Sequence, residues 1–517
     1  MTEATHTARP GGLLRPAGAD TTGLIPTAAL TEQAVTDLGL DRLFDPSVAD
    51  APWLADLYRR PCADVATIRY RQAIAAELTD PEVAAPFESL VSDVRRLQQR
   101  LQATARVPDP VARHSWFLAA AERYVACLRT FQDAVSALTL RAQGLVAARD
   151  RVVALLAADR HQVLVEETTA IRSQLDALTF TVRMQGGRVT VDRLRDEPDL
   201  AAQVSATFGR FRMGTPTPIE PTATEAGGDR ITARILELVA AQHPEPFARL
   251  GALHDRAQPL VAPEVEELVA ELPFYLGVLP RFRRLADAGL PITFPDLVGH
   301  DGACQADGSY DLAVGMRRLS EGEEVVPNSW WLEGHERIMV VTGANQGGKT
   351  TFARAFAQLH HLSALGLPVP ARSATVGVHD RVRTHFERQE QMTSLRGKLQ
   401  DELERLHELL AEATEASVIV LNETFSSTTL ADARTLGRIF LDRLARLGAR
   451  VVYVTFVDEL AGAGGRVVSM VAGVAEDDPT RRTFRIERRP PDGLAHAMAL
   501  ADSYGLSEAA LRQRFAP

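Results

Sequence analysis

The chain of 517 residues is 45% hydrophobic and 24% charged, a balance typical of globular proteins and a length sufficient for several domains. Its net charge of −10 excludes a generally basic nucleic-acid-binding surface, so any DNA contact would need a local patch. No run of about 18 apolar residues occurs, so we expect no membrane span. Three cysteines without metal spacing suit a reducing, cytoplasmic compartment.

The N-terminal half has two kinds of sequence. Residues 1–30 are rich in Thr, Ala, Gly and Pro and lack the basic start and apolar core of a signal peptide, so we predict a flexible tail. Over residues 31–290, apolar residues recur at three- and four-residue spacing, as at Leu90, Val94 and Leu97. This period predicts a domain of long amphipathic helices.

One short segment interrupts the helical pattern. In residues 179–191, two alternating β-rich runs flank a Gly-Gly pair, which predicts a β-hairpin. Arg183, Arg188 and Arg193 lie in or beside it. They could contact DNA phosphates, or they could guard a solvated strand edge against aggregation. Both interpretations stay open.

Residues 291–517 have the alternation of short apolar strands and amphipathic helices that is typical of an α/β domain. The whole chain is therefore predicted as multidomain α and α/β. The predicted strands cover 337–342, 418–421 and 451–455, and the predicted helices begin at 350, near 396 and near 432.

A phosphate-binding loop is the most specific motif in the chain. The pattern G-x-x-x-x-G-K-[ST] lies between a predicted strand and a predicted helix. Its glycines let main-chain N–H groups face phosphates, its lysine neutralises them, and its hydroxyl can bind Mg²⁺. The chain has only one other lysine, Lys398. The predicted ATP-binding residues are Gly343, Ala344, Asn345, Gln346, Gly347, Gly348, Lys349, Thr350 and Thr351.

The strand at 418–421 continues into Asn422 and Glu423. A carboxylate at this position can act as a general base toward the attacking water, which makes Glu423 the candidate catalytic residue. The alternative is a solvated acid at a strand end. The Thr350 hydroxyl of the loop is the candidate group for holding Mg²⁺.

These motifs together resemble the MutS family of mismatch-repair ATPases. The loop TGANQGGKTTFAR is similar to the family's TGPNxGGKST, and residues 426–433 resemble its G-T-S-T-x-D-G segment. Further similar stretches lie at 60–72, 326–328, 491–493 and 503–506.

The resemblance implies an ABC-type P-loop ATPase domain after a helical core and lever domain with a small clamp-like hairpin. It also implies ATP and Mg²⁺ as cofactors, a homodimer formed through the ATPase domains, and association with DNA. The first 50 residues contain no Phe-x-Glu wedge. We therefore expect a MutS-like protein without the family's N-terminal mismatch-recognition domain.

Four departures from the family pattern bear on mechanism. Asn422 replaces an Asp that supports Mg²⁺, Phe456 replaces a switch His, and Val325 replaces an aromatic that stacks on adenine. The Ser-rich signature is not recognisable in residues 393–404, where Lys398 is either a substitute cation or a surface lysine. An Asn cannot supply the missing negative charge, although a nearby acid could take over its role.

We expect a DNA-associated ATPase with slow hydrolysis, acting in repair or recombination. The alternative is a nucleotide-gated scaffold or clamp that binds ATP without useful turnover, which Asn422 and Phe456 favour. A transporter motor of the same broad type is disfavoured by the attached helical domain.

Overall fold

A computed structural model describes residues 11–18, 26–48, 52–185, 188–193, 230–387, 397–475 and 481–491. The chain forms two compact units. The first comprises residues 1–84, 140–145 and 271–517, and the second comprises residues 85–139 and 146–270. These limits differ from the domain limits drawn from sequence periodicity, because the first unit combines the N-terminal segment with the α/β region. The functional division at about residue 290 stays a prediction.

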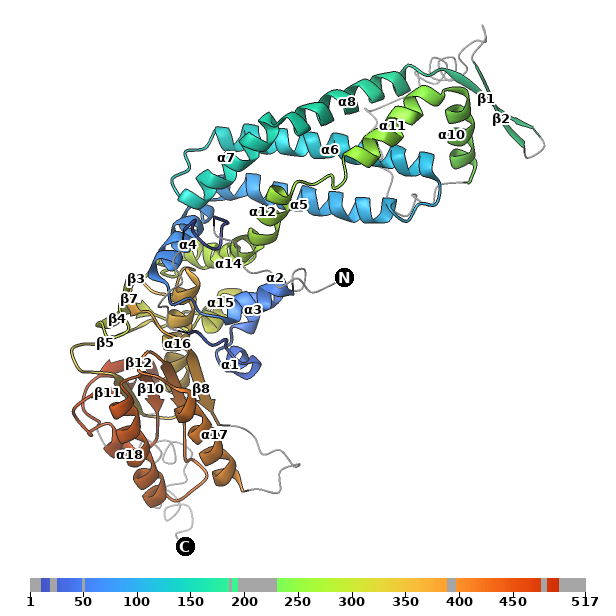
Figure 1. The fold of residues 1–517 in the computed structure, drawn as a ribbon. Coiled ribbons are helices and arrows are strands. Elements are labelled where there is room, and N and C mark those ends of the chain that lie inside the picture. The colour runs from blue at the N-terminus through green and yellow to red at the C-terminus, as the bar shows by residue number, and fades with distance from the viewer. Residues whose placement is uncertain are drawn as a thin grey trace. The chain divides into compact units, whose positions relative to one another are not determined.

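The second unit consists of helices and a hairpin (Figure 1). Helix α6 shows why the sequence is helical there. Asp109 caps it by accepting a hydrogen bond from Val111 N at 2.9 Å, and Pro110 occupies its first turn. Its helices are α5 (Pro81–Thr104), α6 (Pro110–Ser136), α7 (Gln143–Ala157), α8 (Asp159–Asp176), α10 (Arg230–Gln242), α11 (Pro244–Arg256) and α12 (Pro263–Glu271). Among the described helices, none is both long and apolar enough to cross a membrane.

The predicted hairpin is confirmed. Strands β1 (Phe180–Gln185) and β2 (Arg188–Arg193) pair antiparallel, and the Gly-Gly pair between them lies outside the described residues. Arg183 lies 3.8 Å from Asp192 on the opposite strand, and both side chains are exposed. A surface ion pair of this kind contributes little to stability.

A six-stranded sheet forms the centre of the first unit. Its order is β12-β11-β6-β10-β9-β8, with all strands parallel except the antiparallel edge strand β12. Continuous apolar runs such as VIVL and VVYV suit strands buried on both faces. The strands are β6 (Ile338–Gly343), β8 (Val382–Phe386), β9 (Val418–Asn422), β10 (Arg450–Val454), β11 (Val467–Val474) and β12 (Arg482–Arg488).

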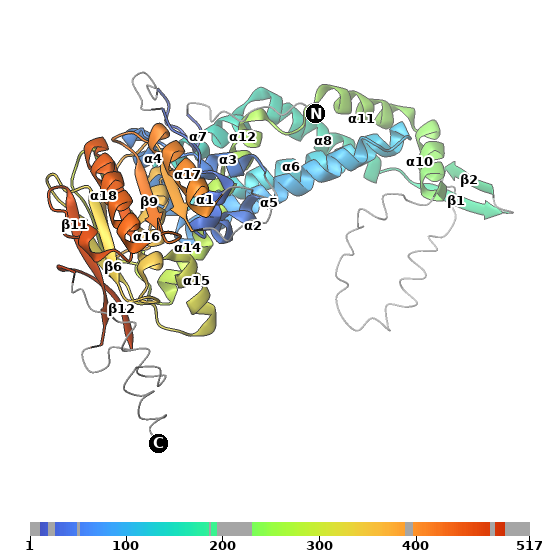
Figure 2. The same ribbon diagram turned by 90° about the horizontal axis from the view of Figure 1, so that it is seen from below.

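Helices cover both faces of this sheet (Figure 2). Helices α17 (Lys398–Glu412) and α18 (Leu430–Leu447) share one apolar cluster with Ile338, Ile419 and Val451. Helix α16 (Lys349–Leu365) contacts β9 and β10. Since side chains alternate along a strand, the residues between the cluster members face α16. The predicted strands and helices of this region are confirmed to within a few residues.

A second sheet of the first unit has the order β3-β7-β4-β5. Sequence periodicity did not indicate its strands, because segments such as CQADGS and SATVG are short and partly polar. They are β3 (Asp296–Val298), β4 (Cys304–Ser309), β5 (Asn328–Leu332) and β7 (Ser373–Gly377). The remaining helices of the unit are α1 (Glu32–Asp37), α2 (Asp41–Val48), α3 (Trp53–Arg59), α4 (Val65–Leu78), α13 (Pro273–Leu276), α14 (Leu279–Asp287) and α15 (Leu312–Glu321).

Part of the predicted flexible tail is firmly bound, which corrects the sequence interpretation. Leu13 and Leu14 are 0% and 2% exposed. Leu13 N donates to Glu271 Oε2 at 2.5 Å, and Tyr275 donates its hydroxyl proton to Leu13 O at 2.7 Å. Arg71 Nε donates to Leu14 O at 2.8 Å. The partners lie far away in the sequence, so local composition cannot reveal them.

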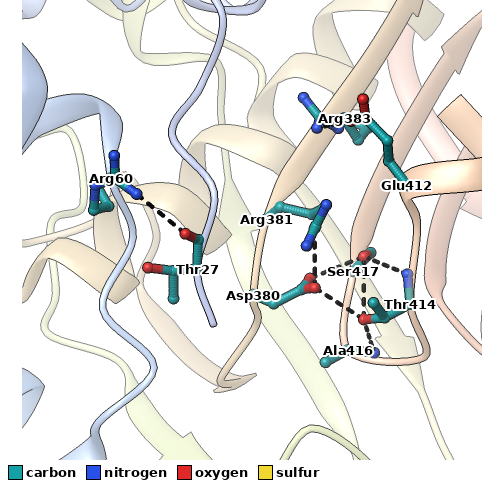
Figure 3. A network of polar contacts seen from close by, with 9 residues as sticks. All are labelled: Thr27, Arg60, Asp380, Arg381, Arg383, Glu412, Thr414, Ala416 and Ser417. Carbon is teal, nitrogen blue, oxygen red and sulfur yellow. Dashed lines mark hydrogen bonds and ion pairs between the residues drawn. The ribbon is translucent and has the colours of Figure 1, made fainter. Parts of the chain in front are cut away.

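A second N-terminal stretch is anchored on Asp380. Figure 3 shows the side-chain contacts of Asp380 with Arg381, Thr414 and Ser417. Ala28 N donates to the main-chain oxygen of Asp380 at 3.0 Å. The buried carboxylate of Asp380 accepts hydrogen bonds from Ser417 Oγ at 2.8 Å and Thr414 Oγ1 at 3.0 Å. Arg381 Nε also donates to it at 3.0 Å. Asp380 therefore holds the start of β9 and the N-terminal segment together.

Three histidines are buried in the first unit: His360 and His361 on α16, and His379 between β7 and β8. Burial lowers the pKa of His360 to about 3 and that of His361 to about 4, and it holds the pKa of His379 well below 6.5. His360 Nδ1 donates to Phe356 O at 2.9 Å, and His361 Nε2 donates to Tyr58 O at 2.7 Å. The folded protein therefore keeps these rings neutral at neutral pH.

We predict that the free energy of unfolding falls as pH is lowered from 6.5 to 5. In this window the unfolded chain gains protons on these histidines while the folded chain does not. Each histidine adds up to about 1.4 kcal/mol per pH unit. His361→Gln keeps a donor for Tyr58 O and should reduce the slope by about one proton in urea unfolding. A slope in His361→Gln equal to that of the natural chain would contradict the prediction.

Candidate nucleotide-binding site

The loop between β6 and α16 requires its glycines. Gly343 has φ of 102°, and a Cβ placed on it would lie 2.8 Å from the Ala472 carbonyl oxygen. A Cβ on Gly347 would lie 2.9 Å from Ala344 O. Gly348 precedes the helix at φ of 90°, where other residues are strained. The main chain can thus turn tightly and leave its surface free of side chains.

The N-terminus of α16 is open to a ligand. Gly348 caps the helix without a side-chain hydrogen bond, so the first main-chain N–H groups, at Lys349, Thr350 and Thr351, depend on other partners. Such N–H groups and the helix dipole favour an anion. Gln346, Gly348, Lys349, Thr350 and Thr351 all line one pocket with a volume of about 320 Å³.

Lys349 is a buried cation, only 5% exposed. Its Nζ donates to Gly343 O at 2.8 Å, Ala344 O at 3.2 Å and Asn345 Oδ1 at 3.2 Å. Desolvation lowers its pKa, while the negative charges of Glu423 and Asp458 oppose that shift. Its hydrogen-bonding partners are neutral oxygens, so the ammonium group retains charge that a phosphate can neutralise. The loop therefore fits the phosphates of a nucleoside triphosphate.

The structure brings Asn422 and Thr350 together. Asn422 ends β9 and is 8% exposed, and Thr350 Oγ1 donates to Asn422 Oδ1 at 2.8 Å. These hydroxyl and amide oxygens are hard donors that fit Mg²⁺. Neither carries charge, so they support the ion less than a carboxylate would.

Glu423 lines the same pocket as the loop. Its main-chain N donates to Val454 O at 2.9 Å, and its φ of 55° places it in the left-handed region. This geometry arises because β9 and β10 are parallel neighbours whose carboxyl ends meet at one edge of the sheet. Sequence reasoning anticipated the residue type but not this strained conformation.

Sequence reasoning missed two residues of β12. Phe484 lines the pocket, is 41% exposed, and would lie 3.7 Å from a Cβ placed on Gly348. Arg482 Nε donates to Asn345 O at 3.0 Å. The only signal was one aromatic in the arginine-rich segment RTFRIER. Val325 lines the same pocket. Position 325 therefore supplies no aromatic ring to the site, whereas Phe484 does supply one.

The remaining candidate residues lie outside this group. Phe456 is 43% exposed beyond β10. Lys398 Nζ forms an ion pair with Glu387 Oε1 at 2.6 Å. Glu459 forms an ion pair with Arg434 at 3.1 Å. The sequence segment at 503–506 lies outside the described residues.

The strand, the glycine-rich loop and the helix bearing a buried lysine have the arrangement of the P-loop class of nucleotide-binding domains. Residues 339–511 match the family model of MutS domain V. The chain is 26% identical over 437 residues to "DNA mismatch repair protein MutS" of Symbiobacterium thermophilum, covering 77% of this chain and 48% of the relative. It is 24% identical over 359 residues to "Endonuclease MutS2" of Gemmatimonas aurantiaca, covering 68% and 42%.

A third relative, "DNA mismatch repair protein MutS" of Granulibacter bethesdensis, is 27% identical over 275 residues, which cover 52% of this chain and 27% of the relative. Residues 339–511 therefore match a MutS-type domain, and the chain over most of its length is similar to proteins of the MutS family. It spans about half or less of the length of these curated relatives.

We predict that Lys349→Ala weakens ATP binding at least about tenfold. The variant removes the cation nearest the phosphates, and a hydrogen bond to a charged group is worth roughly 1.5–3 kcal/mol. Isothermal titration calorimetry measures the change. Lys398→Ala removes the other lysine, at an exposed ion pair, and should bind ATP as the natural chain does. Unchanged affinity in Lys349→Ala would show that the triphosphate binds elsewhere.

Proposed function

We propose that this chain is an ATP-binding MutS-like protein with slow ATP hydrolysis that acts on DNA in repair or recombination. One observation carries the proposal: Lys349, Thr350 and Glu423 line one pocket, with Asn422 hydrogen-bonded to Thr350. A cation, a metal-binding hydroxyl and a carboxylate in one place are the parts needed to position and hydrolyse a triphosphate.

In this proposal each residue has a definite task. The main-chain N–H groups of the loop and Lys349 bind the phosphates and neutralise their charge. Mg²⁺, when bound, withdraws charge from the phosphate oxygens. Thr350 and Asn422 would hold that ion or a water bound to it. Glu423 accepts a proton from the attacking water. Phe484 offers an aromatic face to the base.

Asn422 explains why hydrolysis should be slow. Its amide oxygen can accept a hydrogen bond from Thr350 or from a metal-bound water, but it adds no negative charge to the site. An ATP-bound state would then persist. If turnover is negligible, the chain acts instead as a nucleotide-gated scaffold or clamp, which Asn422 and the exposed Phe456 favour.

We predict that Asn422→Asp raises the ATPase rate about tenfold, equivalent to about 1.4 kcal/mol of activation free energy. The carboxylate restores charge beside Mg²⁺ without changing side-chain size. A phosphate-release assay gives the rate, and calorimetry should show intact ATP binding. Adding Glu423→Gln to this variant should abolish the gain, because the general base is lost. Normal binding with no faster hydrolysis would show that Asn422 does not limit the rate.

The partners follow from the family and from local chemistry. We propose a homodimer formed through the ATPase domains, with the region of Ser426 and Asp432 at the contact. DNA would be bound through local basic residues such as Arg183, whose partner Asp192 is exposed. The relatives named for mismatch repair support DNA as the substrate.

We predict weak, salt-sensitive DNA binding without preference for a single mispair over perfect duplex. The net charge of −10 confines contact to local phosphate binding, and such binding weakens steeply with salt. Competition between mispaired and perfect duplexes in fluorescence anisotropy measures the preference. Arg183→Ala should lower affinity for both duplexes equally. A clear mismatch preference would contradict the prediction and require a base-reading element within this chain.

A further inference from the structure

The turn that follows β9 is strained at two residues. Glu423 has φ of 55° and Phe425 has φ of 62°, and neither is glycine. Left-handed conformations cost free energy for such residues, so they persist only where the surroundings hold them. The conformation of this turn therefore sets the orientation of the Glu423 side chain, and contacts with neighbouring elements must hold the turn in that conformation.

Contacts from β10 hold the first half of the turn. Glu423 N donates to Val454 O at 2.9 Å, and Thr424 Oγ1 donates to the Tyr453 hydroxyl at 2.6 Å. The ring of Phe425 is 1% exposed and lies 6.5 Å from the ring of Phe440 on α18. These contacts fix the start of the turn and one side chain at its end.

The main chain at the end of the turn is held by helix α17. Glu402 is 6% exposed, and its Oε1 accepts a hydrogen bond from Phe425 N at 2.7 Å. His385 Nε2 lies 3.5 Å from the same oxygen. Leu406 and Leu409 of the same helix belong to the apolar cluster under the sheet. A carboxylate buried beside such residues costs desolvation free energy unless it is hydrogen-bonded.

We propose that Glu402 is a positioning residue for ATP hydrolysis: its carboxylate fixes the main chain at Phe425 and thereby aims Glu423 at the attacking water. The inference rests on the proposed function, in which Glu423 is the general base. It makes α17 part of the catalytic apparatus, so a movement of this helix changes the hydrolysis rate without touching the phosphates.

Two substitutions of Glu402 distinguish the effect of side-chain length from the effect of its negative charge. Glu402→Gln keeps an oxygen at the same distance and loses the charge beside His385. Glu402→Asp keeps the charge and withdraws the oxygen by one methylene. If the hydrogen bond to Phe425 N positions Glu423, Glu402→Gln should retain kcat within about threefold, whereas Glu402→Asp should lower it about tenfold.

The remaining variants control for folding and binding. Glu402→Ala should lower kcat at least as much as Glu402→Asp. ATP affinity should stay unchanged, because Glu402 is not among the hydrogen-bonding partners of Lys349. Glu408→Ala removes an exposed carboxylate from the same helix and should leave kcat unaltered. Thermal unfolding of Glu402→Gln and Glu402→Asp checks that both fold.

The outcomes separate the two proposals. A natural chain that binds ATP and hydrolyses none overturns the general base and the positioning role together. Measurable hydrolysis that is equal in Glu402→Asp and the natural chain overturns the positioning role alone. A kcat lowered more by Gln than by Asp would assign the effect to the charge beside His385, and this too overturns it.

Discussion

Burial of the Lys349 ammonium group is the constraint on which the nucleotide site depends. A cation removed from water is stable only if polar atoms and negative charge surround it. The oxygens of Gly343, Ala344 and Asn345 supply the hydrogen bonds, and the fields of Glu423 and Asp458 oppose the fall in its pKa. These acids follow β9 and β10. The site therefore requires β6, β10 and β9 to be adjacent parallel strands that end at one edge.

The helix that carries this lysine is anchored at its other end. Helix α16 is buried along most of its length, and His361 in its fourth turn donates to Tyr58 O. The ring of Tyr58 stacks on Phe44 at 4.5 Å, so the N-terminal helices α2 and α3 pack around the same helix. The N-terminal segments are thus structural parts of the unit that holds the candidate nucleotide site. Leu13 and Leu14 belong to the same unit, where their main chain is bonded to Glu271, Tyr275 and Arg71, although the composition of this stretch suggests a tail.

Two features of the candidate site bear on the proposed hydrolysis rate rather than on nucleotide binding. Asn422 lacks the charge of a carboxylate, and the turn at Glu423 and Phe425 is strained. Strain at a functional residue needs several contacts to maintain it. Those contacts come from β10, α17 and α18, which makes the orientation of Glu423 a property of the packed domain.

Local sequence patterns were sufficient to predict the glycine-rich loop, the strands that flank it and the hairpin. Each of these has a local pattern: glycines before Lys349, continuous apolar runs, or alternation around a Gly-Gly pair. Three contacts depend on the packing of distant segments: Phe484 lines the pocket, Glu402 accepts a hydrogen bond from Phe425 N, and Glu271 accepts one from Leu13 N. The two hydrogen bonds join residues that are 23 and 258 positions apart. Phe484 lies on β12, far in the sequence from the loop that it faces. Local periodicity specifies which face of an element is apolar, but not which distant residue packs against it.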